Sequence, residues 1–382
     1  MNAGTAAQTP MSGDPMDDVE RMLIDSARAL FRDRQNTARM KLNAAQASAF
    51  DAGLWREMAD MGWLGLRLPE ALGGQNLPLS TAAALAEQFG AAMMPEPFIA
   101  CGIIPSAFLA SNSATSEALS LGEAISAGSA VTSLAWQEQI GQTDPANITT
   151  RLTASGRLQG RKLFVPNADS SNFFIVAART DLGLVLANVR ASAGGLKSEL
   201  HRTGDGTHRA QLIFNDTPIE SVLSEGDAAR AALAAALEEG TLASAAYQTG
   251  LATAALDLVL SHLKTRIQFD RPLGTFQTLQ HRTADLYMAC QLSRASWRRA
   301  AIRWGTQPDS ASTRAAISAA KSRASQTALR VARSAVQMFG GLGFAEEADV
   351  GLALRIALQY SSWLGSPAQH LQRFATLSGL RA

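Results

Sequence analysis

Cationic, amide and aromatic side chains gather in one stretch of the last third of the chain, from Thr265 to Gln280. Arg266, Gln268 and Phe269 stand at the end of a helical pattern, and a Pro/Gly break separates them from Gln277. A guanidinium carries a permanent charge and a planar fork of N–H donors, which suits it to binding an anion. It could also simply offset the dipole of the helix that it ends, which is worth about 0.3–1 kcal/mol.

A second stretch, Gln337 to Phe344, places Gly340 and Gly341 directly after another helical pattern. Because glycine has no side chain, the backbone there can approach a bulky anionic ligand closely. The same glycines could instead form a helix C-cap and a turn. Both interpretations stay open on the residues alone.

The composition excludes several classes of function. Of 382 residues, 47% are hydrophobic and 18% are charged, and the net charge is +1, so there is no electrostatic case for binding nucleic acid. Cys101 and Cys290 are far apart and in no motif, which indicates neither a disulfide framework nor a metal site. No apolar run reaches about 18 residues, so we expect no membrane span.

Three regions must position these residues. We expect a disordered tail at 1–15, a helical domain at 16–128, a β-domain at 129–224 and a helical bundle at 225–382. The tail lacks a basic segment, so it does not resemble a signal peptide, and we expect a soluble, cytoplasmic protein. Alternation of β-branched and polar residues predicts strands at 148–153, 163–165, 173–177, 184–189 and 210–214. Helices, then strands, then helices indicate an α+β protein.

Four motifs in this order resemble the acyl-CoA dehydrogenase family over nearly the full length. They are Trp63–Gly74, Leu158–Lys162, Leu263–Phe269, and Gln337–Phe344 followed by Glu347. The resemblance implies an N-terminal helical domain, a middle β-barrel or sandwich, and a C-terminal four-helix bundle. The runs 275–282 and 365–371 resemble one branch, the small subunits of heteromeric, pimeloyl-CoA-type acyl-CoA dehydrogenases.

By this resemblance the cofactor is FAD, and the C-terminal bundle of one subunit reaches the flavin of its neighbour. The motif residues would then contact the dinucleotide: Arg266 the pyrophosphate, Gln268, Phe269 and Gln277 the adenosine half, with Gln337, Gly340 and Gly341 closing over it. Asp270 departs from the family, which usually has glycine there, and an acidic group near a pyrophosphate would repel it unless it is turned away.

The match weakens in the β-domain, where the family holds the flavin ring. Phe164 can stack on a ring, although it is equally expected as an ordinary core residue of a strand. The family's hydroxyl residue two positions later is Pro166, which has no N–H and no hydroxyl to donate to flavin N5.

The chemistry that the family performs needs a base to remove the proton alpha to a thioester. Leu364 stands at the usual position of the catalytic glutamate, and Gly240 stands at the alternative position. Glu238 and Glu239 are its neighbours, and we take Glu239 as the candidate base. The alternative is that both are surface residues offsetting the dipole at a helix N-terminus. His281 and His370 are more readily interface or core residues.

Three functions remain open. The first is an FAD-dependent acyl-CoA dehydrogenase that forms a trans-2-enoyl-CoA and passes hydride to flavin N5. The second is a non-catalytic subunit of an α2β2 enzyme that completes a partner's FAD site, and the third is a flavin monooxygenase of the same fold. The resemblance implies an acyl-CoA substrate, an electron-transfer flavoprotein or similar acceptor, and a homo- or hetero-oligomer, dimer or tetramer.

Overall fold

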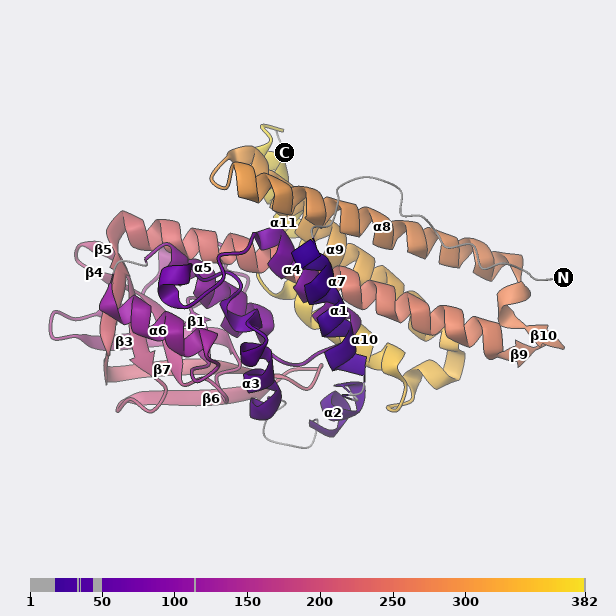
Figure 1. Ribbon diagram of the computed structural model, residues 1–382, viewed down its shortest axis with the longest axis horizontal. Helices are drawn as coiled ribbons and strands as arrows, with labels where there is room; N and C mark the ends of the chain where they lie inside the picture. Colours follow the sequence, from indigo (N-terminus) through magenta and orange to yellow (C-terminus); the bar gives the residue numbers. More distant parts are fainter. Residues whose placement is uncertain (1–17, 33, 35, 44–49, 113–114, 381–382) are drawn as a thin grey trace.

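The computed structural model describes the chain except for residues 1–17, 33, 35, 44–49, 113–114 and 381–382. The tail expected at 1–15 therefore lies outside the described residues. The N-terminal helices pack against one end of a bundle of long helices, and a β-sheet lies beside them at the same end (Figure 1). None of the described helices is both long enough and apolar enough to cross a bilayer.

The N-terminal region is helical, as its periodicity predicts. Asp51 caps α3 by accepting hydrogen bonds from the backbone N–H groups of Gly53 and Leu54, which begins the helix at a defined residue. The helices of this region are α1 (Asp18–Arg32), α2 (Asn36–Asn43), α3 (Ala52–Asp60), α4 (Leu79–Ala91), a π-helical turn (Phe98–Ile103), α5 (Ile104–Ala110) and α6 (Ser116–Ser126).

The middle region forms a sheet in the order β6-β7-β3-β2-β4-β5-β8, with β1 paired in parallel to β4. The strands are β1 (Thr132–Ala135), β2 (Arg151–Leu152), β3 (Arg157–Pro166), β4 (Phe173–Thr180), β5 (Gly183–Arg190), β6 (Leu196–Arg202), β7 (His208–Pro218) and β8 (Ser221–Glu225). Strand β2 is shorter than the strand expected at 148–153. The sheet also contains β1, β6 and β8, which alternation alone did not predict.

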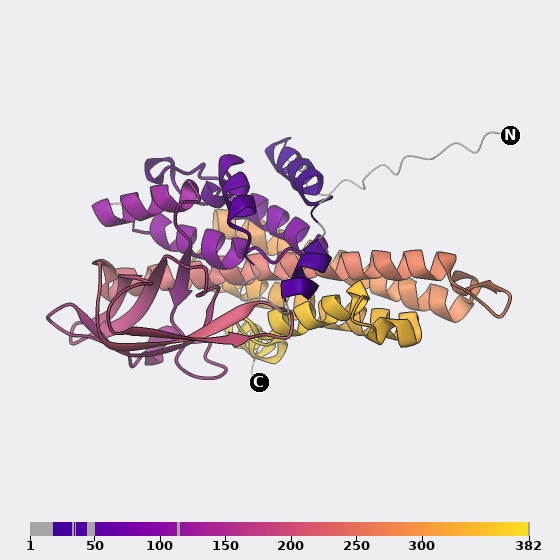
Figure 2. The same cartoon turned by 90° about the horizontal axis from the view of Figure 1, so that it is seen from below.

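The C-terminal region is a bundle built on one long helix, α7 (Gly226–Thr265), which is 40 residues long. It runs from the sheet to the far end of the molecule, where a small hairpin of β9 (Ile267–Gln268) and β10 (Arg271–Pro272) projects (Figures 1 and 2). The other helices are α8 (Gln277–Thr306), α9 (Ala311–Phe339), α10 (Asp349–Ser362) and α11 (Pro367–Leu377). Small residues such as Ala243, Ala246 and Ala252 are fully buried along α7, so the helices approach one another closely.

Candidate functional site

The two ligand-type stretches of the sequence meet at the far end of the bundle. His262, one turn before Arg266, stacks on Phe339, which directly precedes Gly340; the ring centroids are 4.2 Å apart and the planes 16° apart. Helix α7 ends at Thr265 and α9 at Phe339, so both stretches begin where a long helix stops. We call residues 262–277 together with 337–344 the arm.

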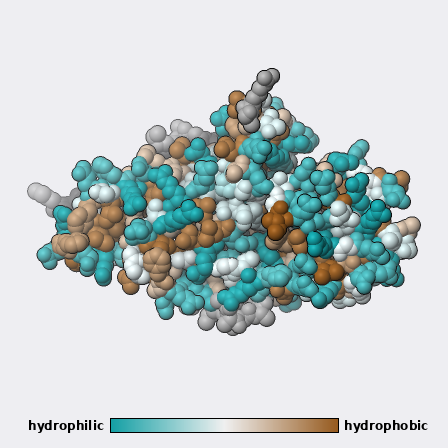
Figure 3. Space-filling model, turned by 180° about the vertical axis from the view of Figure 1, so that it is seen from behind, coloured by the Kyte–Doolittle hydropathy of each residue, from teal (hydrophilic) through white to brown (hydrophobic). Residues whose placement is uncertain are grey.

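The arm presents its polar and apolar side chains to solvent. Arg266, Gln268, Gln277 and Gln337 are exposed, and among the described residues the Arg266 guanidinium has no ion-pair partner. Large apolar side chains lie among them, with exposed fractions of 61% for Ile267, 82% for Phe269, 55% for Leu342 and 83% for Phe344. Figure 3 shows hydrophobic side chains at this end and at several other places on the same face. Such a mixture is typical of a surface that is covered by a partner or ligand.

Contacts among its own side chains stabilise the hairpin at the tip of the arm. The Arg271 guanidinium lies 4.0 Å from the centroid of the Phe276 ring, and Phe269 meets the same ring edge-on. Phe269 and Asp270 both have positive φ angles, 53° and 59°, which the tight turn imposes. Asp270 is exposed at this tip.

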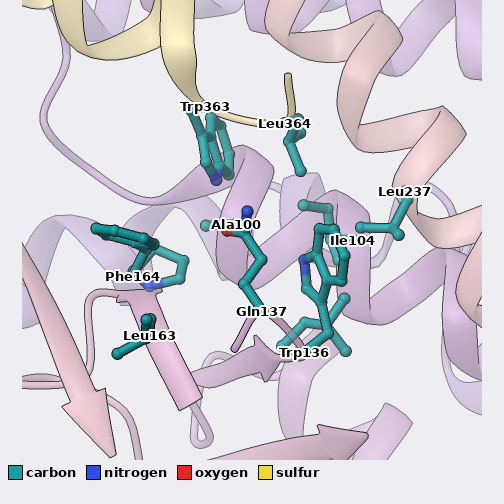
Figure 4. A pocket seen from close by; sticks show the side chains of 11 residues that line it. Ala100, Ile104, Trp136, Gln137, Leu163, Phe164, Leu237, Trp363 and Leu364 are labelled. Atoms are coloured by element: carbon teal, nitrogen blue, oxygen red, sulfur yellow. The ribbon is translucent and has the colours of Figure 1, made fainter. Parts of the chain in front are cut away.

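A second cluster lies at the opposite end of the bundle, around the turn between α10 and α11. Leu364 has a φ of 61° and is only 8% exposed. Its side chain points toward Ile104 and Leu237. The Trp363 indole lies next to it, on the side of Phe164 (Figure 4). We call Trp363 to Gly365 the Leu364 turn.

The space beside the Leu364 turn is small and apolar. A cavity of about 10 Å³ lies between Leu364, Trp363, Phe164 and Trp136, and none of the acidic residues that the structure describes lines it. A volume of about 10–15 Å³ is what one water molecule needs, so there is no room here for an acyl chain. On this side of Leu364, none of the described side chains is an acid that could remove a proton, and there is no space for a substrate.

A much larger cavity, about 680 Å³, opens between the sheet and the Leu364 turn. Its walls, drawn from the described part of the chain, are aromatic and amide side chains without a carboxylate; among them are Phe164, Trp363, Gln137, Gln142, Gln211, Gln359 and Gln369. Phe164 sits where the register of β3 against β7 shifts between Lys162 and Val165. This bulge, with a φ of 56°, turns its ring out of the strand, and the residue is 43% exposed.

A buried ion pair fixes the strand next to that bulge. Lys162 Nζ donates to Glu138 Oε1 at 2.6 Å, and the same carboxylate accepts from the backbone and hydroxyl groups of Thr149 and Thr150. Burial raises the pKa of Glu138, but Lys162 and these hydrogen bonds outweigh it and bring the pKa to about 2. Burial lowers the pKa of Lys162 to about 8. The pair therefore holds the start of the bulge rigidly.

The two glutamates of α7 are buried in the middle of the helix, because α7 begins at Gly226 and not near residue 238. The alternative expectation, that they are surface residues at a helix N-terminus, is therefore wrong. The Glu239 carboxylate accepts from Arg67 at 2.5 and 2.8 Å and from the Trp304 indole at 3.1 Å. Glu239 lines neither the cavity beside the Leu364 turn nor the larger one against the sheet.

Glu238 faces the Leu364 turn instead. It pairs with Arg373 of α11 and lines a cavity of about 130 Å³ on the other side of Leu364, together with Thr241, Arg314 and His370. The sequence placed both glutamates near this point but could not assign which one reaches it, because a helix turns about 100° per residue.

His370 stabilises the Leu364 turn through a hydrogen bond to its backbone. Its Nε2 lies 2.8 Å from the Leu364 carbonyl oxygen, and since a carbonyl only accepts, Nε2 carries the proton. Burial, together with the nearby Lys321 ammonium, lowers the pKa of His370 to about 4. Burial also lowers the pKa of Lys321, to about 7; this ammonium donates to Ser244 and to the Tyr360 carbonyl. His370 is thus a neutral core residue, as expected, and His281 is exposed on α8.

Comparison with known proteins agrees with this architecture. The model of the acyl-CoA dehydrogenase N-terminal domain matches residues 17–117, and that of the C-terminal domain matches residues 229–376. A solved structure, a variant of the Tcur3481-Tcur3483 steroid ACAD, is 30% identical, with a TM-score of 0.84 over 94% of this chain and 97% of that one. The chain belongs to the acyl-CoA dehydrogenase family.

Other members agree over similar lengths. Acyl-CoA dehydrogenase IpdE2 of Mycolicibacterium smegmatis is 26% identical over 94% of this chain and 98% of its own length. The butyryl-CoA dehydrogenase of Megasphaera elsdenii has the same fold, with a TM-score of 0.86 at 22% identity, covering 97% of this chain and all 100% of that one. The expected order of helical domain, β-domain and helical bundle is therefore confirmed.

The family assignment also confirms the expected cofactor, FAD. The residues present fit it in part: the 680 Å³ cavity has the size of a ligand site, its aromatic walls suit a planar ring, and the exposed guanidinium of Arg266 suits a phosphate group. Pro166, which lines the neighbouring cavity of about 10 Å³ and not the large one, offers no hydrogen-bond donor to a ring. Sequence reasoning missed Trp363 and Arg209 as cavity walls, since no local pattern marks them.

Proposed function

We propose that this chain is a subunit of a heteromeric FAD-dependent acyl-CoA dehydrogenase, of the small-subunit type, which lends its arm to a flavin held by a homologous partner. One observation carries this proposal: the arm is intact and exposed, while the space between Leu364 and Phe164 contains about 10 Å³ and no acid from the described residues. The name of the 30% identical structure joins two chains, Tcur3481 and Tcur3483, which supports an assembly of unlike subunits.

In the assembled enzyme, bound FAD would supply the acceptor for the hydride that leaves the beta carbon of an acyl-CoA thioester. The roles of this chain's own residues follow from charge and exposure. Arg266 pairs with the pyrophosphate through its planar fork of donors. Gln268, Phe269, Gln277 and Gln337 contact the adenosine half, and Gly340 and Gly341 admit it closely. The base belongs to the partner, and an electron-transfer flavoprotein or similar protein takes up the electrons.

A catalytic role for this chain alone is favoured by one observation. Glu238 lines the cavity of about 130 Å³ next to Leu364, so a carboxylate stands within one side chain of the usual base position. In that function Glu238 or Glu239 would remove the proton, after giving up Arg373 or Arg67.

The experiment compares the chain purified alone with the chain co-expressed with a homologous subunit that carries the glutamate. We expect colourless protein alone, and a yellow complex with one FAD per pair of unlike chains, measured by absorbance and by light scattering after size-exclusion chromatography. Yellow protein alone that holds one FAD per chain and reduces a dye with an acyl-CoA would overturn the proposal. Oxygen consumption without enoyl-CoA formation would instead favour a monooxygenase.

A further inference from the structure

Trp363 and Arg209 form the wall between two cavities. Both line the 680 Å³ cavity, and both also line a smaller one of about 30 Å³ behind it. The smaller cavity is bounded by Met94, Pro97, Ile99 and Ala100 on its apolar side and by Tyr247 and Tyr360 on another. It has room for about two water molecules.

Arg209 is buried without an ion-pair partner among the described residues. It is 9% exposed, and within the same part of the chain its Nη1 has no hydrogen-bond acceptor. Asp205 lines the same small cavity, but its Oδ1 already accepts from Thr203 and Thr207. A buried charged donor without an acceptor is costly, so a group that supplies one gains free energy on binding.

Trp363 covers this guanidinium. The Arg209 Cζ lies 5.0 Å from the centroid of the indole, which also meets Tyr360 edge-on at 5.5 Å and 89°. The indole projects from the turn that follows α10 and borders the 680 Å³ cavity. Rotating this one side chain away would join the two cavities and uncover Arg209.

We propose that the small cavity is the closed state of a binding pocket for a carboxylate on an aliphatic chain, with Arg209 as its head group and Trp363 as its cover. The chain enters from the 680 Å³ cavity, displaces the indole and lies along Met94, Ile99 and Ala100, while its carboxylate accepts from Nη1. No bond is formed or broken. This binding site is separate from the arm, and it rests on the proposed function in one respect, that the 680 Å³ cavity of this chain holds no flavin.

The test uses the full chain alone, without flavin or partner, and titrates octanoate and its neutral counterpart octanamide by calorimetry and indole fluorescence. We expect octanoate to bind and octanamide to bind at least about 10-fold more weakly, because hydrogen bonds to a charged donor favour the anion. Trp363→Ala should tighten octanoate binding at least about 10-fold, since the cover no longer has to be displaced. Arg209→Met should weaken it at least about 10-fold in either background.

Two further variants keep the result interpretable. Trp363→Phe replaces Trp363→Ala if the latter fails to fold, and His281→Ala, at an exposed site on α8 away from both cavities, should leave octanoate affinity unchanged. Equal affinities for octanoate and octanamide, no binding by Trp363→Ala, or full binding by Arg209→Met would each overturn the pocket. Because the titration involves neither the arm nor a partner's flavin, failure here leaves the subunit proposal standing.

Discussion

The arm and the Leu364 turn lie at different points of the same bundle and differ in how their polar groups are used. In the arm, Arg266 and the amides are exposed to solvent, where a ligand can meet them. At the Leu364 turn, Glu238, Glu239 and His370 are buried and already bonded within the chain. Substitutions should therefore cost mainly ligand binding at the first site and mainly folding stability at the second.

The largest effect is expected for Glu239→Gln. Removing this charge leaves the Arg67 guanidinium partly buried without its carboxylate, which should lower the free energy of unfolding by about 3–5 kcal/mol. Denaturant unfolding measures this loss. The double variant Arg67→Met with Glu239→Leu removes both charges and should recover most of it. If Glu239→Gln kept full stability but abolished dehydrogenation by the isolated chain, Glu239 would be a base. Its role would then be catalytic and not structural, contrary to the contrast drawn between the arm and the Leu364 turn.

Acidification should weaken the Leu364 turn through His370. Its pKa is about 4 in the folded chain, below the ordinary 6.5. Between pH 4 and 6.5 the imidazole therefore binds a proton in the unfolded chain but stays neutral in the folded chain. Stability should fall as the pH drops from about 6.5 to 4, by on the order of 3 kcal/mol, and gain nothing further above about 6.5. Unfolding curves at several pH values test this. His370→Gln should flatten the fall, and His281→Gln, at an exposed site, should not; identical slopes for both would rule it out.

At the arm, Arg266→Met should lower flavin retention by the assembled enzyme about 10- to 100-fold, the range for a hydrogen bond to a charged group. Stability should change by less than about 0.5 kcal/mol, because the side chain is exposed. Flavin fluorescence released on dilution measures retention. The matched control is Arg299→Met, which removes an exposed arginine from α8. Equal retention in both variants would reduce Arg266 to a helix-end cation.

The smallest effect should separate the two adjacent glycines. Gly340 has a φ of 63° and a ψ of −140°, which side chains disfavour, so Gly340→Ala should cost about 1–3 kcal/mol of stability. An added Cβ at Gly341 meets open space, so Gly341→Ala should cost less than about 0.5 kcal/mol and act only on flavin retention. Thermal unfolding and flavin release give the two numbers. A stability loss at Gly341 as large as at Gly340 would contradict this division.

Much of the fold follows from local patterns, and the exceptions have local causes. Apolar stripes such as Ala328, Val331 and Ala335, which are buried on α9, predict long helices. Strand β6, Leu-Lys-Ser-Glu-Leu-His-Arg, is mostly exposed, so no alternation marks it, and pairing with β7 makes it a strand. Strand β2 shrinks because Thr149 and Thr150 bond to the Glu138 carboxylate.

The candidate site also has one part that the sequence predicts and one part that it does not. Residue types alone identified the arm, since exposed groups act through their own chemistry. The surroundings of Glu239 could not be predicted, because its partner Arg67 lies 172 positions away along the chain. The same holds for Trp363 and Arg209, which become neighbours only through packing of the bundle on the sheet.

Helix α7 carries the glutamates in its middle and delivers Arg266 at its end, in one piece of 40 residues. At 1.5 Å per residue this is a rod of about 60 Å, anchored by its buried half in the core. A helix of this length keeps the hairpin of β9 and β10 at a fixed distance from the sheet, even when side chains near Leu364 change. Substitutions beside Leu364 can therefore change the acid and base groups there without moving Arg266 relative to the bundle.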